Sequence, residues 1–428
     1  MAGAWINIFI GEGDASTLVY MKLNNIKLIC AQNEFTLSEN VLNSYGDVIV
    51  GWSHQDEPDN AQWNGSSYDP CVDPTEIQSL YNQWKTNDST RPVYLNLGQG
   101  VSNIDWTGRG TCTGKWEMYD DYILGCDIVA YDIYPVSTNQ TNVQGNLWYL
   151  PKGVDSLRSW CNDQKPVWDW IECTPVHQNI KPTKEQVTYL VWSSIIHGAR
   201  GISYFAPKLP GQSGADYDGV LNDPVMLDHI TQLNQQILSL APVLNSNDIL
   251  NRVEVSSSNS EVPVDILVKE YQGVLYIFAA AMRNSSTTAS FTVQNVPTNT
   301  VFVLGEDREI TISGNNFEDD FSGYGVHLYQ IGGTGIIQPG RIAQNQELSV
   351  FISPNPFYHR VRITNVKRNL KQIKVFNLQG ELVFSQTFNS ALQQINWSAK
   401  DLLPGVYTVN LITTNNQLGV YSVIKLAQ

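Results

Sequence analysis

Short apolar runs alternate with longer amphipathic stretches from residue 5 to about residue 245, which is typical of repeated strand and helix units around a parallel sheet. Runs rich in β-branched and aromatic residues predict seven strands, at Ile6–Ile10, Ile26–Cys30, Val48–Trp52, Val93–Leu97, Ile128–Tyr131, Val167–Ile171 and Ile202–Phe205. Apolar residues at spacings of three and four predict helices at Glu76–Lys85, Gly153–Trp160, Lys184–His197 and Pro224–Leu240. The pattern therefore predicts an α/β fold, a (β/α)8 TIM-type barrel that lacks one strand.

The pattern changes after Pro242 to alternating polar and apolar positions without helices, as in Val274–Ala280. Such alternation predicts antiparallel sheets with one face buried. We expect a barrel domain over residues 1–245, a β-sandwich over 246–332, a glycine-rich linker over 333–347 and a second all-β sandwich over 348–428.

Composition excludes several classes of partner. The chain has 26 Lys plus Arg against 41 Asp plus Glu, for a formal net charge of -15. Such a field repels phosphate backbones and anionic membrane surfaces, so nucleic acid is not an expected partner. No apolar run reaches the length that crosses a bilayer, so no membrane insertion is expected.

The six cysteines all lie in the first 173 residues and lack the paired short spacings of zinc or redox sites. We therefore expect no metal and no cofactor. Cys30 and Cys126 belong to apolar runs and are interpreted as buried thiols. Cys71 and Cys112 lie in polar, turn-rich loops, which are equally compatible with a disulfide and with two free thiols.

Two predicted strands end in acidic residues, where the mouth of a barrel would be. Glu57 follows the strand at Val48–Trp52 within Ser-His-Gln-Asp-Glu-Pro, and Glu172 ends the strand at Val167–Ile171. Active sites of barrels form at this face. Hydrolysis of a glycosidic bond needs one carboxylic acid to protonate the leaving oxygen and a second carboxylate to attack or to activate water. The alternative is that each is an ordinary solvated loop glutamate.

These residues resemble glycoside hydrolase clan A, which carries its acid/base and its nucleophile after the fourth and seventh barrel strands. The resemblance covers about residues 5–245 and implies that Glu57 is the acid/base and Glu172 the nucleophile of a retaining enzyme, with a family 42 β-galactosidase as the nearest shape. It also implies that the first barrel strand is absent and that the chain is N-terminally truncated. Two positions depart from the clan, with Asp56 in place of an asparagine and Tyr204-Phe205 in place of a tryptophan.

Further polar and aromatic residues at strand ends are candidates for binding substrate. By resemblance, the Tyr134 hydroxyl would orient the nucleophile, and the alternative is a core tyrosine. The other candidates offer hydroxyl-binding groups or flat rings for the C–H face of a sugar, and plain packing is the alternative for the rings. They are Trp52, His54, Asp56, Asn96, Trp168 and Trp170.

The C-terminal segment has a resemblance of its own. Ser353-Pro-Asn-Pro-Phe357, Ile373–Val383 with its Asn-Leu-Gln-Gly hairpin turn, Leu403–Val409 and the terminal Lys-Leu-Ala-Gln resemble the sorting domain of the Bacteroidetes type nine secretion system. The resemblance implies contact with the secretion machinery and a place outside the cell or on its surface. The N-terminus has no visible signal peptide. The alternative is a carbohydrate-binding or fibronectin-like appendage.

These observations predict a secreted retaining glycoside hydrolase that cleaves a β-linked polysaccharide or oligosaccharide. The rival hypothesis is a non-catalytic carbohydrate-binding surface protein on a degenerate barrel. We expect the carboxyls of Glu57 and Glu172 to lie roughly 5 to 5.5 Å apart and the pKa of Glu57 to be the higher. We also expect either that the N-terminal residues or a neighbouring chain close the gap in the barrel, or that the protein is less stable and less active than a version restored with an upstream strand.

Overall fold

The computed structural model divides into two compact units, Met1–Gly340 and Arg341–Gln428. Each has its own hydrophobic core. The structure describes residues 4–209, 215–332, 350–353, 359–365, 369–377, 382–392, 394–400, 402, 405–413 and 418–425. The predicted linker at 333–347 lies outside the described residues.

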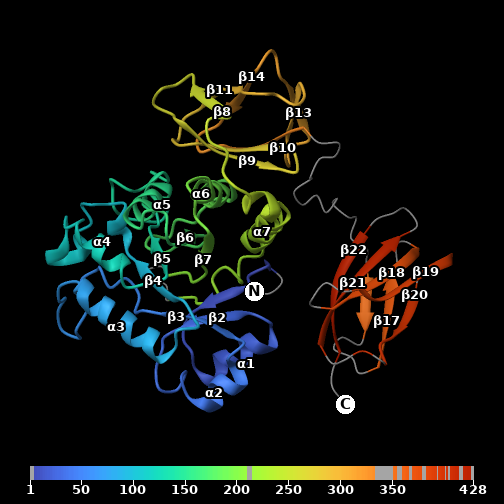
Figure 1. Cartoon of the computed structure of the whole chain (residues 1–428), viewed down its shortest axis with the longest axis horizontal. Helices are drawn as coiled ribbons and strands as arrows, with labels where there is room; N and C mark the ends of the chain where they lie inside the picture. Colours follow the sequence, from blue (N-terminus) through green and yellow to red (C-terminus); the bar gives the residue numbers. More distant parts are fainter. Residues whose placement is uncertain are drawn as a thin grey trace. The chain divides into compact units, whose positions relative to one another are not determined.

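One curled parallel sheet organises the first unit (Figure 1). Its strands follow the chain from one edge to the other: β1 (Ile8–Ile10), β2 (Lys27–Cys30), β3 (Ile49–Ser53), β4 (Val93–Leu97), β5 (Ile128–Asp132), β6 (Val167–Glu172) and β7 (Gly201–Phe205). All pairs are parallel. Since helices follow the strands, the sheet is an open TIM-type barrel, and the predicted fold class is confirmed.

The sheet does not close on itself. Within the described residues, β1 and β7 each pair on one side only, and the side chains of both strands are partly exposed. The residues before β1 lie against the last helix of the barrel, where Asn234 donates a hydrogen bond to the Ala4 carbonyl (2.9 Å). The closure of the gap by the N-terminal residues or by a neighbouring chain stays a prediction.

Helices cover the outside of the sheet. They are α1 (Ala15–Leu23), α2 (Glu39–Tyr45), α3 (Pro74–Asn87), α4 (Met118–Ile123), α5 (Tyr149–Trp160), α6 (Lys184–Ile196) and α7 (Pro224–Leu244), with short 3-10 helices η2 (Gln99–Val101) and η3 (Thr107–Cys112). The four predicted helices are present, and three begin at side-chain caps, on Asp73, Thr183 and Asp223. The short helices α1, α2 and α4 had not been predicted.

Helix α5 comes very close to the sheet at Gly153. A β-carbon at this position would lie 2.1 Å from Cζ of Tyr131 on β5. The Tyr131 hydroxyl lies beneath the first turn of α5 and donates a hydrogen bond to the Tyr149 carbonyl (3.1 Å). Glycine is therefore required at residue 153 for this helix to pack on this strand.

Antiparallel sheets follow the barrel, as predicted. The strands are β8 (Val253–Ser257), β9 (Val264–Tyr271), β10 (Val274–Ala281), β11 (Thr287–Val293), β12 (Thr300–Val303), β13 (Arg308–Thr311), β14 (Asn316–Phe321) and β15 (Val326–Ile331). One sheet has the order β13-β12-β15-β10-β9 and the other β14-β11-β8. Alternate residues of β11, Ala289, Phe291 and Val293, are buried in the core between the sheets.

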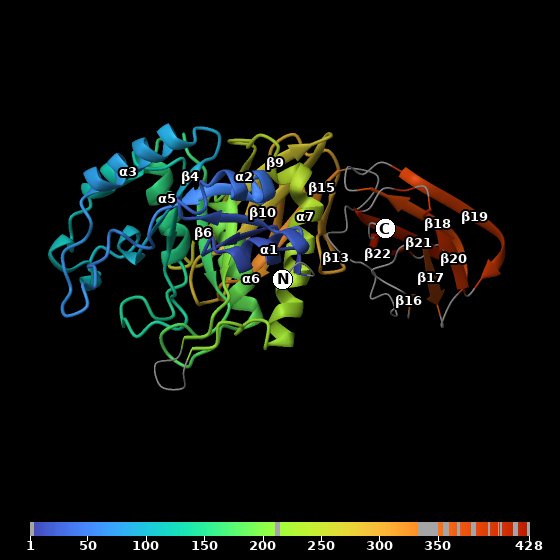
Figure 2. The same ribbon diagram turned by 90° about the horizontal axis from the view of Figure 1, so that it is seen from below.

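These sheets pack on the helix layer of the barrel, with α6 and α7 beside β9 and β10 in both ribbon views (Figure 2). Trp192 of α6 stacks on Phe278 of β10, with ring centroids 5.4 Å apart. The two parts share one core. The barrel and these sheets belong to one compact unit. The domain boundary at residue 245 therefore stays a prediction.

The second unit is an all-β sandwich with its own core around Ile363 and Trp397. Its strands are β16 (Val350–Ser353), β17 (Arg360–Asn365), β18 (Leu370–Phe376), β19 (Leu382–Leu392), β20 (Gln394–Ser398), β21 (Gly405–Thr413) and β22 (Leu418–Lys425), in sheets β16-β17-β20 and β19-β18-β21-β22. Strands β18 and β19 pair antiparallel, as a hairpin requires, but residues 378–380 of its predicted turn lie outside the described residues.

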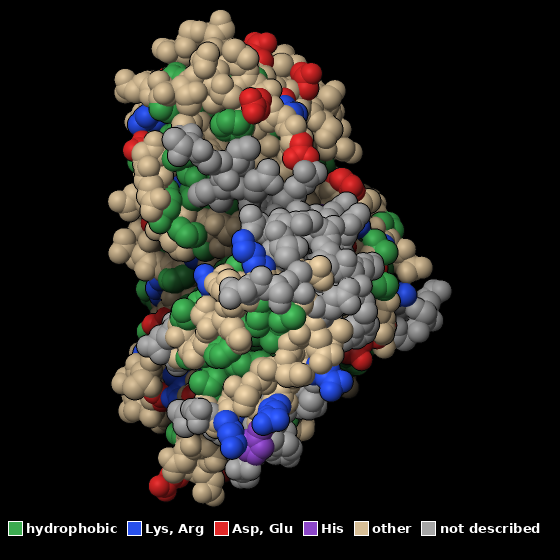
Figure 3. All heavy atoms as spheres, turned by 90° about the vertical axis from the view of Figure 1, so that its right-hand side faces the viewer, with side chains coloured by type: hydrophobic (Ala, Val, Ile, Leu, Met, Phe, Trp, Pro, Cys, Tyr) green, Lys and Arg blue, Asp and Glu red, His purple; other side chains and the backbone are tan. Residues whose placement is uncertain are grey.

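On the face drawn in Figure 3, several Asp and Glu side chains lie over the sheets of β8–β15. Among the described helices, none combines the length and the apolar composition that crossing a membrane requires.

Candidate active site

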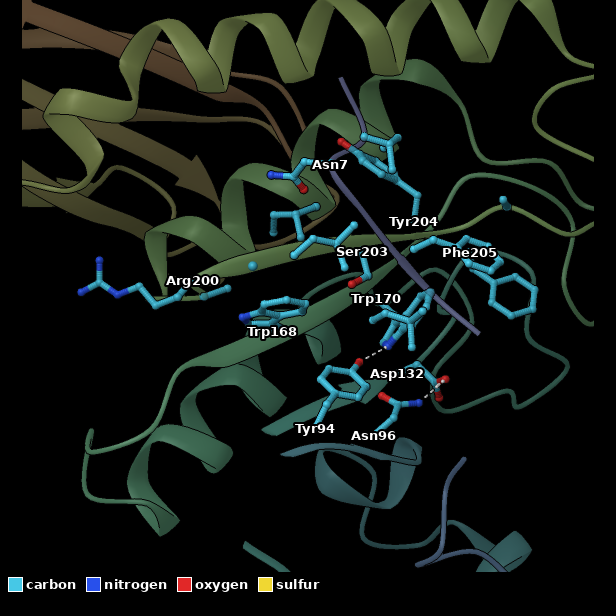
Figure 4. Close-up of a pocket in the computed structure, with 18 of the residues that line it drawn as sticks. Asn7, Tyr94, Asn96, Asp132, Trp168, Trp170, Arg200, Ser203, Tyr204 and Phe205 are labelled. Carbon is cyan, nitrogen blue, oxygen red and sulfur yellow. Dashed lines mark hydrogen bonds between the residues drawn. The ribbon is translucent and has the colours of Figure 1, made fainter. Parts of the chain in front are cut away.

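The polar residues that end the parallel strands meet beside a cavity of about 1360 Å³ inside the open barrel. Its walls come from both edge strands, from α7 and from the middle of the sheet, so the open edge is part of the cavity. Figure 4 shows Trp168 and Trp170 on the same wall as Asn96 and Asp132, with Arg200 at the far end.

Two carboxyl groups are in direct contact beside this cavity, and one of them, that of Asp132, belongs to a residue of its wall. Glu57, on the turn after β3, shares a hydrogen bond with Asp132 at the end of β5. Burial raises the pKa of Glu57, and it raises the pKa of Asp132 well above its usual range, with a further contribution from the neighbouring Glu57 carboxyl. Because two contacting carboxyls cannot both ionise easily, the titrations of Glu57 and Asp132 are coupled.

Hydrogen-bond donors fix Asp132 in place. Its Oδ2 accepts from the Tyr134 hydroxyl (3.1 Å) and from Nδ2 of Asn96 (3.3 Å). The same Nδ2 donates to Oδ1 of Asp56 (2.8 Å), so Asp56 accepts, as its carboxylate chemistry predicts. The sequence predicted that the Tyr134 hydroxyl orients the nucleophile, and in the structure this hydroxyl contacts Asp132. The Oδ1 atom of Asn96 is buried without a partner.

His54 brings a second unpartnered acceptor to the cavity wall. Its Nε2 lies 2.9 Å from the Gly125 carbonyl, which requires the proton on Nε2 and leaves Nδ1 as an acceptor. That Nδ1 has no partner. The ring stacks on Trp84, and burial lowers the pKa of His54, so the imidazole is neutral at pH 7.

A strained turn carries Glu57. Its backbone has a φ of 43°, in the left-handed region that a residue other than glycine rarely adopts. The Glu57 amide donates to the Asn96 carbonyl (3.2 Å), and Asn60 Nδ2 donates to the Glu57 carboxyl (2.8 Å). The Trp106 indole donates to Asn60 in turn (2.9 Å). These contacts hold the carboxyl in position at a conformational cost of about 1 kcal/mol or more.

A buried charged cluster supports the same turn. Asp59 is fully buried and accepts hydrogen bonds from the Gly98 amide (2.8 Å) and the Tyr119 hydroxyl (2.9 Å), while its carbonyl accepts from Arg109 Nε (3.2 Å). The Arg109 guanidinium also lies 3.9 Å from the Asp59 carboxylate. Charges buried this deeply need such partners, and these contacts tie the turn after β3 to the segment after β4.

A disulfide joins the loops that follow β3 and β4. Cys71 and Cys112 are bonded, which confirms one of the two alternatives that the sequence left open. The bridge closes a loop of 41 residues that contains Arg109, while its partner Asp59 lies before Cys71 in the chain. Cys30 and Cys126 are buried free thiols, as interpreted.

Glu172 lies apart from the cavity. Its side chain is completely buried and accepts hydrogen bonds from the amides of Val136 (2.5 Å) and Ser137 (3.0 Å) and from the Ser137 hydroxyl (2.8 Å). Burial raises its pKa to about 7, although these donors favour the ionised form. Glu172 thus anchors the turn after β5, and the carboxyl that the structure brings to Glu57 is that of Asp132.

The three candidate tryptophans differ in their surroundings. Trp168 and Trp170 are partly exposed on the cavity wall, and the Trp170 indole donates to the Tyr94 hydroxyl (2.8 Å). Trp52 is completely buried and donates to Asp88 (3.1 Å). The structure corrects the prediction for Trp52, because no face of its ring is open to a ligand.

Sequence reasoning did not select Asp132, Asn60 or the Asp59–Arg109 pair as site residues. Asp132 carried a usable signal, since it ends a predicted strand as Glu172 does. Asn60 and Arg109 lie in loops, where no periodicity indicates which side chains turn toward the site. Among the described residues, no group of three or more His, Cys, Asp or Glu side chains could hold a metal ion.

Comparison with protein families identifies the C-terminal unit. Residues 351–425 match the model of a secretion system C-terminal sorting domain. Proteins that carry this domain are exported by the type nine secretion system. This protein is secreted or held at the cell surface. The match confirms the resemblance of the tail and does not extend to the barrel.

Solved structures similar to the chain include glycoside hydrolases. A family 30 subfamily 8 xylanase from Clostridium acetobutylicum is 13% identical over 77% of this chain and 90% of its own, with a TM-score of 0.40. An α-amylase from Geobacillus thermoleovorans is 10% identical over 75% and 80%, with a TM-score of 0.42. At these values the likeness says nothing about activity. No curated protein matches the chain.

Proposed function

We propose that the protein is a secreted glycoside hydrolase that acts on a polysaccharide or oligosaccharide. The observation that carries the proposal is the contact between the carboxyls of Glu57 and Asp132, whose pKa values are both raised, beside a cavity lined by Trp168 and Trp170. Glycosidic hydrolysis needs such a pair, because one group must donate a proton while the other is ionised. Neither nucleic acid nor a cofactor enters the proposal.

Glu57 is the proposed acid/base, because the residue is half-buried whereas Asp132 is buried and held by two hydrogen-bond donors. It protonates the glycosidic oxygen, and the leaving sugar departs with that proton. Asp132 attacks the anomeric carbon at the same time and forms a covalent ester with the sugar. Water then gives a proton to Glu57 and attacks the anomeric carbon, which releases the sugar and restores both carboxyls. Retention needs the two carboxyls about 5 to 5.5 Å apart, so this route requires the hydrogen-bonded pair to separate when a sugar enters between them.

Asp132 is proposed as the nucleophile in place of Glu172, although the resemblance to clan A implied Glu172. The support is physical. Both oxygens of Glu172 accept hydrogen bonds from the turn after β5, whereas Asp132 lies on the cavity wall in contact with Glu57. The predicted spacing of Glu57 and Glu172 and a family 42-like specificity stay predictions.

Hydroxyl recognition is proposed for Asn96 and His54. Each presents a buried acceptor without a partner, Oδ1 and Nδ1 respectively. A buried acceptor without a hydrogen bond costs about 1–3 kcal/mol. A ligand rich in hydroxyl donors would relieve this cost, while the faces of Trp168 and Trp170 suit the C–H face of a sugar ring.

The test is hydrolysis of a panel of plant and algal polysaccharides, with products identified by mass, and of aryl β-glycosides. We expect Glu57→Gln and Asp132→Asn to lower kcat by about 10²- to 10⁴-fold. The exposed Glu34→Gln is the matched control and should leave kcat unchanged.

Azide distinguishes the two nucleophile assignments. With Asp132→Ala and an aryl glycoside, azide should restore cleavage and yield a glycosyl azide of inverted anomeric configuration. The same rescue in Glu172→Ala, without rescue in Asp132→Ala, would assign the nucleophile to Glu172. Absence of hydrolysis of every substrate by the wild-type chain would contradict the proposal itself.

The open sheet favours a second candidate, a carbohydrate-binding surface protein without catalysis. Among the described residues β1 and β7 each have an unpaired edge, so the site has less support than a closed barrel would give it. This candidate predicts retention of the protein by a polysaccharide in native gels without release of sugar.

A further inference from the structure

A hairpin next to Glu57 exposes two aromatic rings side by side. It spans residues 62–69, hereafter the rim hairpin, and Trp63 and Tyr68 form its cross-strand bridge. Their ring centroids are 5.1 Å apart, and the side chains are 59% and 73% exposed. Single exposed rings are common on proteins, but two large rings held together in solvent indicate a binding surface.

The rim hairpin is rigid. Gln62 and Asp69 exchange two backbone hydrogen bonds (3.1 and 2.6 Å). The Asn64 side chain accepts from the amides of Ser66 (3.0 Å) and Ser67 (2.9 Å) and donates to Asp69 (2.9 Å), closing the turn. Because the backbone is fixed in this way, little entropy is lost when a ligand stacks on the rings.

The rim hairpin is also continuous with the active-site turn. Gln62 Nε2 donates to the carbonyls of Glu57 (3.2 Å) and Asn60 (2.8 Å), and the Cys71–Cys112 disulfide follows the second strand of the hairpin. The segment that carries the exposed rings is therefore held by the same turn as the carboxyl that we propose to be the acid.

We infer that the rim hairpin is a binding subsite for a glycan chain, which takes sugar units of a polymeric substrate beyond the bond that is cleaved. Amide and hydroxyl side chains surround the two rings, and Asp69 is the only charged residue in the segment 62–69. This chemistry suits the hydroxyls and C–H faces of neutral sugars. A phosphate-bearing ligand would be repelled by Asp69 and by the net charge of -15.

The inference rests on the proposed function, and the experiment separates the two. The full chain carrying Asp132→Asn is run in native gels that contain soluble xylan, laminarin or galactan at a series of concentrations. We expect retardation by at least one of these polymers, and Trp63→Ala should weaken that binding on the order of tenfold. Trp63→Phe should retain most of the binding. The control is Tyr20→Ala, which removes an exposed ring from α1 (52% exposed).

Kinetics supply the second measurement. In the chain with Asp132 intact, Trp63→Ala should raise KM on the retarding polymer on the order of tenfold, with kcat/KM on a short aryl glycoside unchanged. Equal losses on both substrates, retardation that Trp63→Ala does not change, or no retardation by any polymer would overturn the inference. Binding that depends on Trp63 in a chain that releases no sugar would refute the proposed hydrolase and leave the subsite standing.

Discussion

Glu172 provides the sharpest test of the site, because its two possible roles predict different effects on stability. The sequence predicts that Glu172 is the nucleophile, whereas in the structure it holds the turn after β5 by hydrogen bonds. Glu172→Ala removes the acceptor of three buried donors, the Val136 and Ser137 amides and the Ser137 hydroxyl. An orphaned buried donor costs about 1–3 kcal/mol, so the loss is at least about 3 kcal/mol when the wild-type carboxyl is protonated. A nucleophile that anchors nothing would be lost with almost no change in stability.

The pH dependence of this loss has a definite sign. Burial raises the pKa of Glu172 from 4.5 to about 7. A carboxyl whose pKa is raised on folding contributes stability that is fully present below pH 4.5 and is lost as pH rises through 7. Between pH 5 and pH 8 the wild type should lose about 2–3 kcal/mol relative to Glu172→Ala. The variant is therefore much less stable at pH 5 and nearly equal at pH 8.

Urea unfolding followed by tryptophan fluorescence measures this difference, because 11 of the 12 tryptophans lie in residues 5–192. The exposed Glu34→Ala is the control, and it should show no pH-dependent difference from the wild type. Other titrating groups cancel when the variant is subtracted from the wild type at each pH. A Glu172→Ala chain that matches the wild type at pH 5 and is inactive would refute the anchoring role and restore Glu172 as the nucleophile.

Three other perturbations have definite expected outcomes. Replacing Cys71 and Cys112 with serine should lower the free energy of unfolding by about 4 kcal/mol, the loop entropy for 41 residues, and should also lower kcat. Chemical denaturation and kinetics measure these two effects. Unchanged values would mean that the bridge supports neither the fold nor the site. Gly153→Ala should lower the melting temperature because its β-carbon would overlap Tyr131, and equal melting of the variant and the wild type would show that α5 shifts freely. Burial opposes the protonation of His197, but hydrogen bonds to two aspartates raise its pKa to about 9. The stability of the wild type should therefore fall as pH rises through 9, and the stability of His197→Gln should not show this fall. Thermal melts between pH 7 and 10 measure the difference.

The strained turn at Glu57 explains why neighbouring loops matter to the proposed chemistry. A residue at φ 43° persists only where its surroundings hold it, here Asn60, the buried Asp59 and the disulfide. These supports come from the loops after β3 and β4, and both loops lie at the carboxyl edge of the sheet. The rim hairpin extends from the same turn, so the proposed acid and the proposed subsite depend on one rigid segment.

The sequence by itself determined the elements and their class. Periodicity placed the seven parallel strands, because strand-length β-branched runs between helical spacings are a local property. Caps such as Thr183 with Gln186 set the start of α6 through contacts three residues apart. The sorting domain was likewise visible as motifs in one continuous segment, and its family match confirms it.

Only the tertiary structure decided which strand-end carboxyls meet. Glu57, Asp132 and Glu172 end different strands and are equivalent in the sequence, but burial and hydrogen bonds with residues far along the chain separate them. Asp132 meets Glu57 across 75 positions of sequence, and Glu172 meets the turn at Ser137 instead. The burial of Trp52 and the choice of Cys112 as the partner of Cys71 depend on the same long-range packing, which no local pattern encodes.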